Sequence, residues 1–231
     1  MRLDGKTAIV TGAASGFGAG IARIFAREGA SVMVADINTP AARTIAAEIG
    51  GIARGVDVAN AASVAAMVKA ARDAWGRIDI LVNNAGITHL PKPMEEVTEE
   101  EFDRVLAVNA KSVYLTAREI VPGMKAAGAG AILNIASTAG LSPRPRLNWY
   151  NASKGWMITA TKTMAVELAP FGVRVNALCP VAGETPLLAS FMGEDTPEMR
   201  AKFLSTIPLG RFSTPQDMGE AAAFLCSDAA S

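Results

Sequence analysis

Short runs of apolar, often β-branched residues alternate along the 231-residue chain with longer alanine-rich segments of helical spacing. We expect strands at Thr7–Thr11, Ser31–Ala35, Gly51–Val56, Ile78–Asn83, Gly130–Ala136 and Val173–Leu178, and helices near 17–28, 40–50, 60–75, 98–127 and 150–169. The runs are continuously apolar, as in strands covered on both faces. Such alternation predicts parallel strands with right-handed crossovers and helices on both faces. The expected fold class is α/β, with a single domain over 1–231 and a doubly wound parallel sheet.

One segment departs from this alternation. From about Ala182 to Arg211 the sequence is rich in Gly, Pro, Met and Phe and lacks a clear period. It follows the last expected strand, and ligands of open α/β sheets bind beyond the carboxyl ends of the strands. We therefore expect residues 182–211 to form a lid over a substrate.

Composition excludes several classes of protein. The 22 Lys and Arg balance the 22 Asp and Glu, which argues against a nucleic-acid partner or an anionic membrane surface. No segment approaches the roughly 20 apolar residues of a membrane-spanning helix. Cys179 and Cys226 have no metal-ligand spacing with His89, and the acidic run after Thr98 is typical of a capped helix start. We expect no metal, two reduced thiols and a cytoplasmic protein.

A glycine-rich turn follows the first expected strand and precedes the first expected helix. Glycines let a backbone approach a pyrophosphate, which then rests on the N-terminus of the following helix. A turn of this kind can also be only a tight turn, but its position between strand and helix favours dinucleotide binding. The residues expected to bind are Gly12, Ser15, Gly16, Phe17 and Gly18.

Asp36 closes the second expected strand and is followed by Ile37. A carboxylate there can accept hydrogen bonds from the adenosine ribose hydroxyls and would repel a 2′-phosphate. The alternative is a local turn, although Asn38 and Thr39 already provide a cap before Pro40. No basic residue lies at 13–15 or 37–39, so the sequence favours NAD over NADP.

Tyr150 and Lys154 are four residues apart on an expected helix and therefore lie on one face. A carbonyl that accepts a hydride needs a proton donor, and the reverse reaction needs a base. We expect a nearby ammonium to lower the pKa of Tyr150 from about 10 toward neutrality. Ser137, at the end of the fifth expected strand, could bind the same substrate oxygen, although a lone serine is more often a cap. A chance Tyr-x-x-x-Lys pair is the competing explanation.

Together these motifs resemble the short-chain dehydrogenase/reductase family over essentially the whole chain. The glycine pattern is similar to TGxxxGxG, and residues 83–86 read NNAG. The resemblance implies a Rossmann-like fold with strand order 3-2-1-4-5-6 and further contacts with the cofactor from Asp57, Val58, Asn84, Ala85, Gly86, Tyr150, Lys154, Pro180, Val181 and Thr185. The glycine that commonly follows Pro180 in the family is replaced by Val181.

The resemblance also implies the reaction. Asn109, Ser137, Tyr150 and Lys154 occupy the positions of the family's catalytic tetrad, and Asn109 is the one expected to hold a relay water. The expected activity is reversible hydride transfer between NAD(H) and a secondary alcohol or ketone, with Tyr150 as general acid and base. One alternative is a 3-oxoacyl-carrier-protein reductase. An alternative from another class is a catalytically silent NAD-binding sensor.

Three further expectations concern partners. Arg144, Arg146 and His89 lie near the expected substrate side, and each is either a substrate contact or a solvated loop residue. The helices containing Asn109–Lys125 and Tyr150–Pro170 are expected to pair with their copies in a homotetramer, as the resemblance implies. Members of the family continue into a seventh strand after the segment Ala221–Leu225, so we expect the final strand to be absent from these 231 residues, which makes a dimer an alternative.

Overall fold

The strands form one parallel sheet whose order is the predicted one. A computed structural model describes residues 1–231 and has six parallel strands in the order β3-β2-β1-β4-β5-β6. Their bounds lie within two residues of those expected: β1 Thr7–Thr11, β2 Ser31–Asp36, β3 Ile52–Gly55, β4 Ile80–Asn83, β5 Gly130–Ile135 and β6 Val173–Leu178. The order reverses between β1 and β4, and ligands of such sheets bind at this point. The expected α/β, Rossmann-like fold is confirmed.

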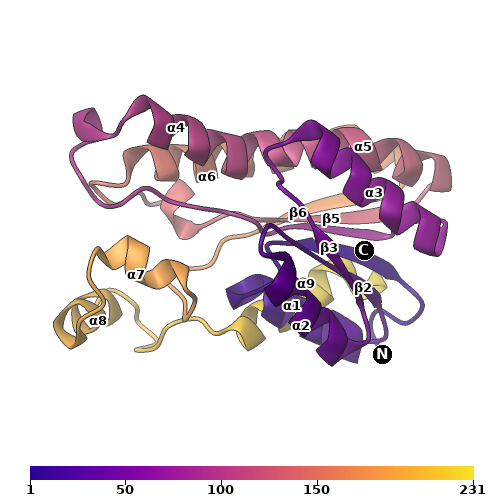
Figure 1. Ribbon diagram of the computed structural model, residues 1–231, viewed down its shortest axis with the longest axis horizontal. Coiled ribbons are helices and arrows are strands. Elements are labelled where there is room, and N and C mark those ends of the chain that lie inside the picture. Colours follow the sequence, from indigo (N-terminus) through magenta and orange to yellow (C-terminus); the bar gives the residue numbers. More distant parts are fainter.

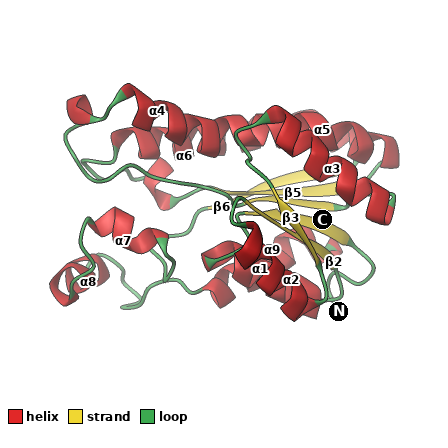
Figure 2. Cartoon of the chain, viewed as in Figure 1, coloured by secondary structure: helices red, strands yellow, loops and turns green.

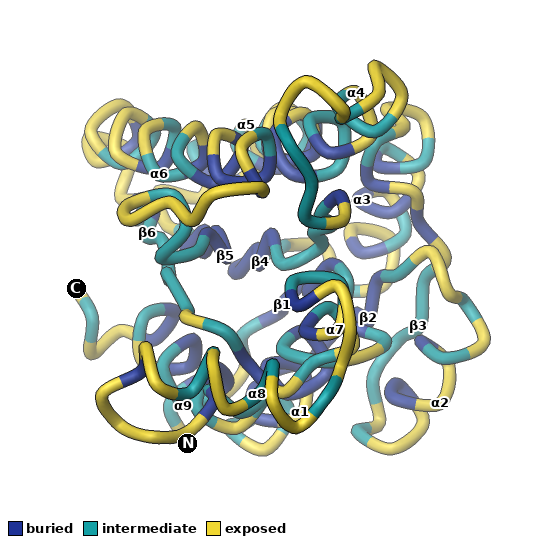
Figure 3. The backbone as a smooth tube through the Cα atoms, turned by 90° about the vertical axis from the view of Figure 1, so that its left-hand side faces the viewer, coloured by how far each residue is buried: buried dark blue, intermediate teal, exposed yellow.

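Helices cover both faces of the sheet (Figures 1 and 2). One layer contains α1 Gly16–Arg27, α2 Thr39–Ile49 and α9 Pro215–Cys226, and the other contains α3 Ala61–Trp75, α4 Glu99–Leu106, α5 Ser112–Ala127 and α6 Asn148–Leu168. Successive strand residues point to opposite faces, so Val10 packs with the first layer and Ile9 with the second. Figure 3 shows the central strands β1, β4 and β5 as buried, the edge strands β3 and β6 as partly exposed, and the outer helix faces as exposed.

The helix expected over 98–127 is divided. It begins at Thr98 with the predicted capping box, in which Thr98 accepts from the Glu101 amide. A π-helical turn at Ala107–Lys111 then separates α4 from α5. Such a turn inserts an extra residue into the helix and changes which face its side chains occupy. Asn109 lies within it and is completely buried.

The chain after β6 is more helical than expected. Residues 182–211 contain two short helices, α7 Leu187–Met192 and α8 Pro197–Leu204, which lie beyond the end of the sheet (Figure 1). The side chains of Leu188, Met192, Ile207 and Phe212 form a small core of their own. The helix α9 was also not predicted, although Thr214 and Asp217 form a capping box at its start.

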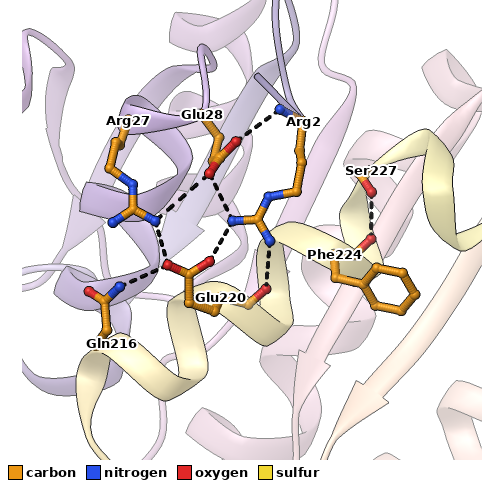
Figure 4. A network of polar contacts seen from close by, with 7 residues as sticks. All are labelled: Arg2, Arg27, Glu28, Gln216, Glu220, Phe224 and Ser227. Atoms are coloured by element: carbon orange, nitrogen blue, oxygen red, sulfur yellow. Dashed lines mark hydrogen bonds and ion pairs between the residues drawn. The ribbon is translucent and has the colours of Figure 1, made fainter.

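Ion pairs join the start of the chain to α9 (Figure 4). The guanidinium of Arg2 donates to Glu28 at 2.8 Å and also pairs with Glu220. Arg27 pairs with Glu220 as well, so two arginines and two glutamates connect α1 to α9. Hydrogen bonds from Arg2 lower the pKa of Glu28 to about 2. The network joins the N-terminal segment of the chain and the end of α1 to α9.

Candidate active site

A cavity of about 730 Å³ lies where the carboxyl ends of the strands meet the glycine-rich turn, the start of α6 and the segment 182–211. Most residues predicted to bind cofactor or substrate line it, although they come from distant parts of the sequence. They are Gly12, Ser15, Gly16, Phe17, Asp36, Ile37, Asp57, Val58, Asn84, Ala85, Gly86, Ser137, Tyr150, Lys154, Pro180, Val181 and Thr185. Two predicted residues, Gly18 and Asn109, do not contribute to its wall.

The glycine-rich turn is held against the end of β4. Gly12 has a φ of 63°, and a Cβ there would lie 2.7 Å from the Cα of Ala85. The amide Nδ2 of Asn84 donates to the carbonyls of Thr11 at 2.9 Å and Gly12 at 3.0 Å. Gly18 lies behind the turn, where a Cβ would be 2.2 Å from the Gly12 carbonyl oxygen. Gly18 therefore permits the close packing of helix and turn rather than forming the cavity surface.

The start of α1 is open toward this cavity. Ser15 is its N-cap residue and makes no side-chain capping hydrogen bond. The first backbone N–H groups of a helix have no partner within the helix and attract anionic groups. The turn and the helix start together therefore form a cradle suited to a phosphate group.

Asp36 makes local hydrogen bonds and also lies in the cavity wall. Its Oδ2 accepts from the Ala14 amide at 3.0 Å, and its Oδ1 accepts from the Asn38 amide at 2.9 Å. The carboxylate thus fastens the glycine-rich turn to the end of β2. An ionised carboxylate has about four acceptor positions, so each oxygen can accept a further hydrogen bond. Asp57, after β3, lies in the same wall and accepts from the Ala59 amide at 2.9 Å.

Tyr150 and Lys154 are buried on one face of α6, and each is 4% exposed. The ammonium Nζ of Lys154 donates to the Ile135 carbonyl at 2.8 Å and lies 5.9 Å from the centroid of the Tyr150 ring. Burial lowers the pKa of Lys154 to about 8. Burial raises the pKa of Tyr150 to about 12, while hydrogen bonding with Ser137 acts in the opposite direction.

The pKa of Tyr150 shifts in the direction opposite to the one expected from the sequence. A lowered pKa was expected from the nearby ammonium, but the loss of hydration on burial is the larger effect, and the opposing effect comes from the hydrogen bond with Ser137. The phenol of Tyr150 is consequently protonated at neutral pH. It is available as a proton donor to a carbonyl oxygen.

The side-chain amide of Asn109 is engaged by neighbouring groups, and the relay water expected at this residue stays a prediction. Its Oδ1 accepts from the Ile87 amide at 2.9 Å, and its Nδ2 donates to the Ile87 carbonyl at 2.9 Å. Nδ2 also donates to the hydroxyl of Ser153 at 3.0 Å. The side chain therefore joins the π-helical turn to the loop after β4 and to α6. It positions its neighbours from behind the cavity wall.

Several lining residues were not identified from the sequence. Phe191 of α7 packs edge-on against the Tyr150 ring with 5.0 Å between centroids, and Phe203 of α8 and Leu187 also line the cavity. The only signal for them was the aromatic and methionine content of 182–211. Ser153, within the tyrosine–lysine motif, was also overlooked.

The three residues considered as substrate contacts differ in whether they line the cavity. Arg144 lines the cavity, whereas Arg146 and His89 do not. Arg146 has a φ of 70° and lies with its guanidinium 3.5 Å from the Pro91 carbonyl. His89 is 4% exposed, and its Nδ1 lies 2.8 Å from the Leu90 carbonyl.

The structure contains neither a metal-binding cluster nor a membrane-spanning helix. No group of three or more His, Cys, Asp or Glu residues is arranged to hold a metal ion. No helix has both the length and the apolar composition that crossing a membrane requires.

Several known proteins are similar to this chain over most or all of its length. A family model described as enoyl-(acyl carrier protein) reductase matches residues 12–231. The 4-formylbenzenesulfonate dehydrogenase TsaC1/TsaC2 of Comamonas testosteroni is 52% identical, covering 100% of this chain and 94% of that protein. The D-threitol dehydrogenase of Mycolicibacterium smegmatis is 42% identical, covering 99% of this chain and 88% of that protein.

A solved structure is similar over nearly the whole chain. It is the 3-ketoacyl-(acyl-carrier-protein) reductase of Brucella melitensis complexed with NADH, which is 50% identical with a TM-score of 0.94. The alignment covers 99% of this chain and 93% of that structure.

Proposed function

Because the chain belongs to the short-chain dehydrogenase/reductase family, we propose that it reversibly reduces a ketone or aldehyde with NADH, and that Tyr150 transfers the proton. The protein is an oxidoreductase that acts on CH–OH or C=O groups of a small molecule with a nicotinamide cofactor. One observation carries the proposal. The cavity that contains the phosphate cradle at Gly12 and Ser15 also contains the buried pair Tyr150 and Lys154.

The residues of the cavity fit a dinucleotide. The cradle at Gly12 leaves no room for a side chain, and the N-terminus of α1 has no side-chain cap. We infer that the turn residues would hold the pyrophosphate. Asp36 and Ile37 would hold the adenosine ribose, and Asp57 and Val58 would hold the adenine. The residues Asn84, Ala85, Gly86, Pro180, Val181 and Thr185 would hold the nicotinamide half. When bound, the cofactor supplies or accepts the hydride.

Side chains of the protein transfer the proton. The Tyr150 phenol, protonated at neutral pH, donates its proton to the substrate oxygen during reduction. The hydroxyl of Ser137, which accepts from the Ala139 amide at 3.1 Å, can still donate to the same oxygen. In the oxidation direction Tyr150 must first lose its proton, so the rate of alcohol oxidation is expected to increase with pH. Lys154, held at the Ile135 carbonyl, stabilises the phenolate that forms.

We propose NAD rather than NADP as the cofactor. Asp36 has no basic neighbour in the cavity wall at 13–15 or 37–39, and its carboxylate is directed to the turn by the Ala14 amide. Two acceptor oxygens at this point favour two ribose hydroxyls. A 2′-phosphate would meet an unbalanced negative charge.

We also propose that 182–211 is a lid. Both of its helices contribute side chains to the cavity, and its packing core is separate from the main core. A segment with few connections to the main core can move without disturbing the sheet.

A homotetramer, with a dimer as alternative, is proposed from the outer surface of α5 and α6. The exposed positions Trp156, Thr159, Thr163 and Val166 follow one stripe of α6, and Tyr114 is exposed on α5. Apolar side chains gathered on neighbouring helices favour association with a second copy. The cytoplasmic location expected from the sequence stays a prediction.

The natural substrate has several candidates. The relatives include a dehydrogenase of an aromatic sulfonate aldehyde and a dehydrogenase of a sugar alcohol, and the solved NADH complex is that of a 3-ketoacyl-(acyl-carrier-protein) reductase. That complex supports the reductase alternative for this chain too. The test is NADH and NADPH oxidation against ketones, aldehydes, keto acids, sugars and acyl thioesters. Turnover of at least one carbonyl compound is expected, and no turnover of any class with either cofactor would contradict the proposal.

A further inference from the structure

We propose that the substrate has an apolar or aromatic body and a carboxylate or sulfonate group, and that Arg144 binds this anionic group. The inference rests on the proposed function, because it assigns the substrate end of the same cavity.

The backbone of Arg144 is fixed beside the proposed proton donor. Arg144 lies in the loop between β5 and α6, between Pro143 and Pro145. Its carbonyl accepts from the Nδ2 of Asn151 at 2.7 Å. Asn151 is 7% exposed and directly follows Tyr150 on α6. The loop that carries the cation is therefore tied to the helix that carries the phenol.

The guanidinium of Arg144 is oriented but not neutralised. It forms no ion pair, and one of its N–H groups donates to the hydroxyl of Thr206 at 2.9 Å. Its Cζ lies 4.7 Å from the centroid of the Phe203 ring. Stacking and one hydrogen bond restrict its position and leave the remaining donors available. An oriented arginine fork is well matched to a planar or tetrahedral oxyanion.

The charges in the cavity wall are unevenly distributed. The two carboxylates, Asp36 and Asp57, follow β2 and β3, where the adenosine is expected. The cationic groups in the wall are Arg104, Arg144 and Lys154. Lys154 is committed to the Ile135 carbonyl, and Arg104 belongs to α4 rather than to the loops around the lid. Arg144 is therefore the cation that stands beside the lid.

Apolar side chains lie with Tyr150 and Arg144 in this part of the cavity. Phe191 packs against the Tyr150 ring, and Phe203 lies beneath the Arg144 guanidinium. Leu187 also lines this part of the lid. A flat apolar body suits these surfaces, with its carbonyl at the phenol and its anionic group at the guanidinium.

The test uses substrates that differ only in charge. NADH oxidation is measured with acetophenone, 4-acetylbenzoate and 4-acetylbenzenesulfonate, and with the corresponding benzaldehydes. We expect kcat/KM for an anionic compound to exceed that for its neutral partner at least tenfold in the wild type. In Arg144→Gln this ratio should fall below three. Arg146→Gln is the matched control, because it removes the same charge two residues away and outside the cavity wall, and its ratio should equal that of the wild type.

The results separate this proposal from the proposed function. Turnover of neutral and anionic compounds at equal kcat/KM, or a ratio unchanged in Arg144→Gln, overturns the anion site and leaves the oxidoreductase intact. If no compound is reduced, the anion site is tested by binding. The affinities of benzoate, benzenesulfonate and benzamide for the NADH-loaded protein are then measured by calorimetric titration. We expect the two anions to bind the wild type and Arg146→Gln at least tenfold more tightly than Arg144→Gln. Equal affinities, or no anion binding to the wild type, overturn the proposal.

Discussion

The side-chain amide of Asn109 is hydrogen-bonded to the hydroxyl of Ser153, with Nδ2 and Oγ 3.0 Å apart. The same hydroxyl donates to the backbone carbonyl of Tyr150 at 2.7 Å. Ser153 is completely buried and connects the π-helical turn to the helix that carries the proposed proton donor. It lies behind the cavity wall, so its contribution is to position Tyr150.

Ser153→Ala is expected to lower kcat about 5- to 30-fold and to change the dissociation constant of NADH less than twofold. The substitution leaves a buried N–H of Asn109 with one partner fewer, which costs about 1–2 kcal/mol. The measurement is steady-state kinetics together with NADH titration. Ser227→Ala is the control, because Ser227 is also buried and bonds a carbonyl three residues earlier, in α9 (Figure 4). An unchanged kcat in Ser153→Ala would contradict the positioning role.

The wild type is expected to prefer NADH over NADPH at least tenfold in kcat/KM, with Asp36 as the cause. Hydrogen bonds to a charged acceptor contribute about 1.5–3 kcal/mol, and tenfold requires about 1.4 kcal/mol. The Asp36→Ala variant should bind NADH more weakly, and its ratio of kcat/KM with NADH to kcat/KM with NADPH should be smaller than that of the wild type. The double variant Asp36→Ala with Ile37→Arg should shift the cofactor preference toward NADPH, because a guanidinium binds the 2′-phosphate of NADPH. Equal use of both cofactors by the wild type would refute this assignment.

The acid stability of the fold is expected to depend on Glu28. Hydrogen bonds from Arg2 lower the pKa of Glu28 to about 2, below the usual value of 4.5. A lowered pKa in the folded state means that the stabilisation is complete above pH 4.5 and is lost as the pH falls toward 2. Glu28→Gln should therefore lower the urea midpoint at pH 7 and reduce its dependence on pH between 5 and 3. Glu167→Gln, which removes an exposed glutamate without an ion pair, should retain the wild-type dependence.

Assembly is expected to depend on the exposed stripe of α6. Val166 is 78% exposed, and a charge there would have to be buried in an interface between copies. Val166→Asp should shift the sedimentation coefficient toward that of smaller species. Leu209→Asp, at a position that is 82% exposed on the segment 182–211, should leave it unchanged. A wild type that sediments only as a monomer at micromolar concentration would exclude this interface.

The parts of the fold that could be predicted are those encoded locally. Apolar runs such as Thr7–Thr11 mark buried strands, and their alternation with helices restricts the sheet to few orders. The turn after β1 and the motif from Tyr150 to Lys154 are contiguous in sequence, so their chemistry was recognisable. The lining residues of the cavity were predicted well wherever such a motif contained them.

The remaining features depend on packing between distant segments. The π-helical turn at Ala107–Lys111 is stabilised by the contacts of Asn109 with Ile87 and Ser153, which no helical period reveals. The contact of Phe191 with Tyr150 requires the lid to be placed first. The direction of the Tyr150 pKa shift likewise depends on how many groups surround the phenol, and a sequence spacing carries no information on burial.

The role of Tyr150 is tested most directly by Tyr150→Phe, measured with NADH and the carbonyl compound that the wild type reduces best. The substitution removes one hydroxyl from a side chain that is 4% exposed and keeps the ring that packs on Phe191. Loss of a general acid lowers rates by about 10²- to 10⁴-fold. We predict a kcat at least 100-fold below that of the wild type, with the NADH dissociation constant changed less than twofold. A kcat within tenfold of the wild type would contradict proton transfer by Tyr150.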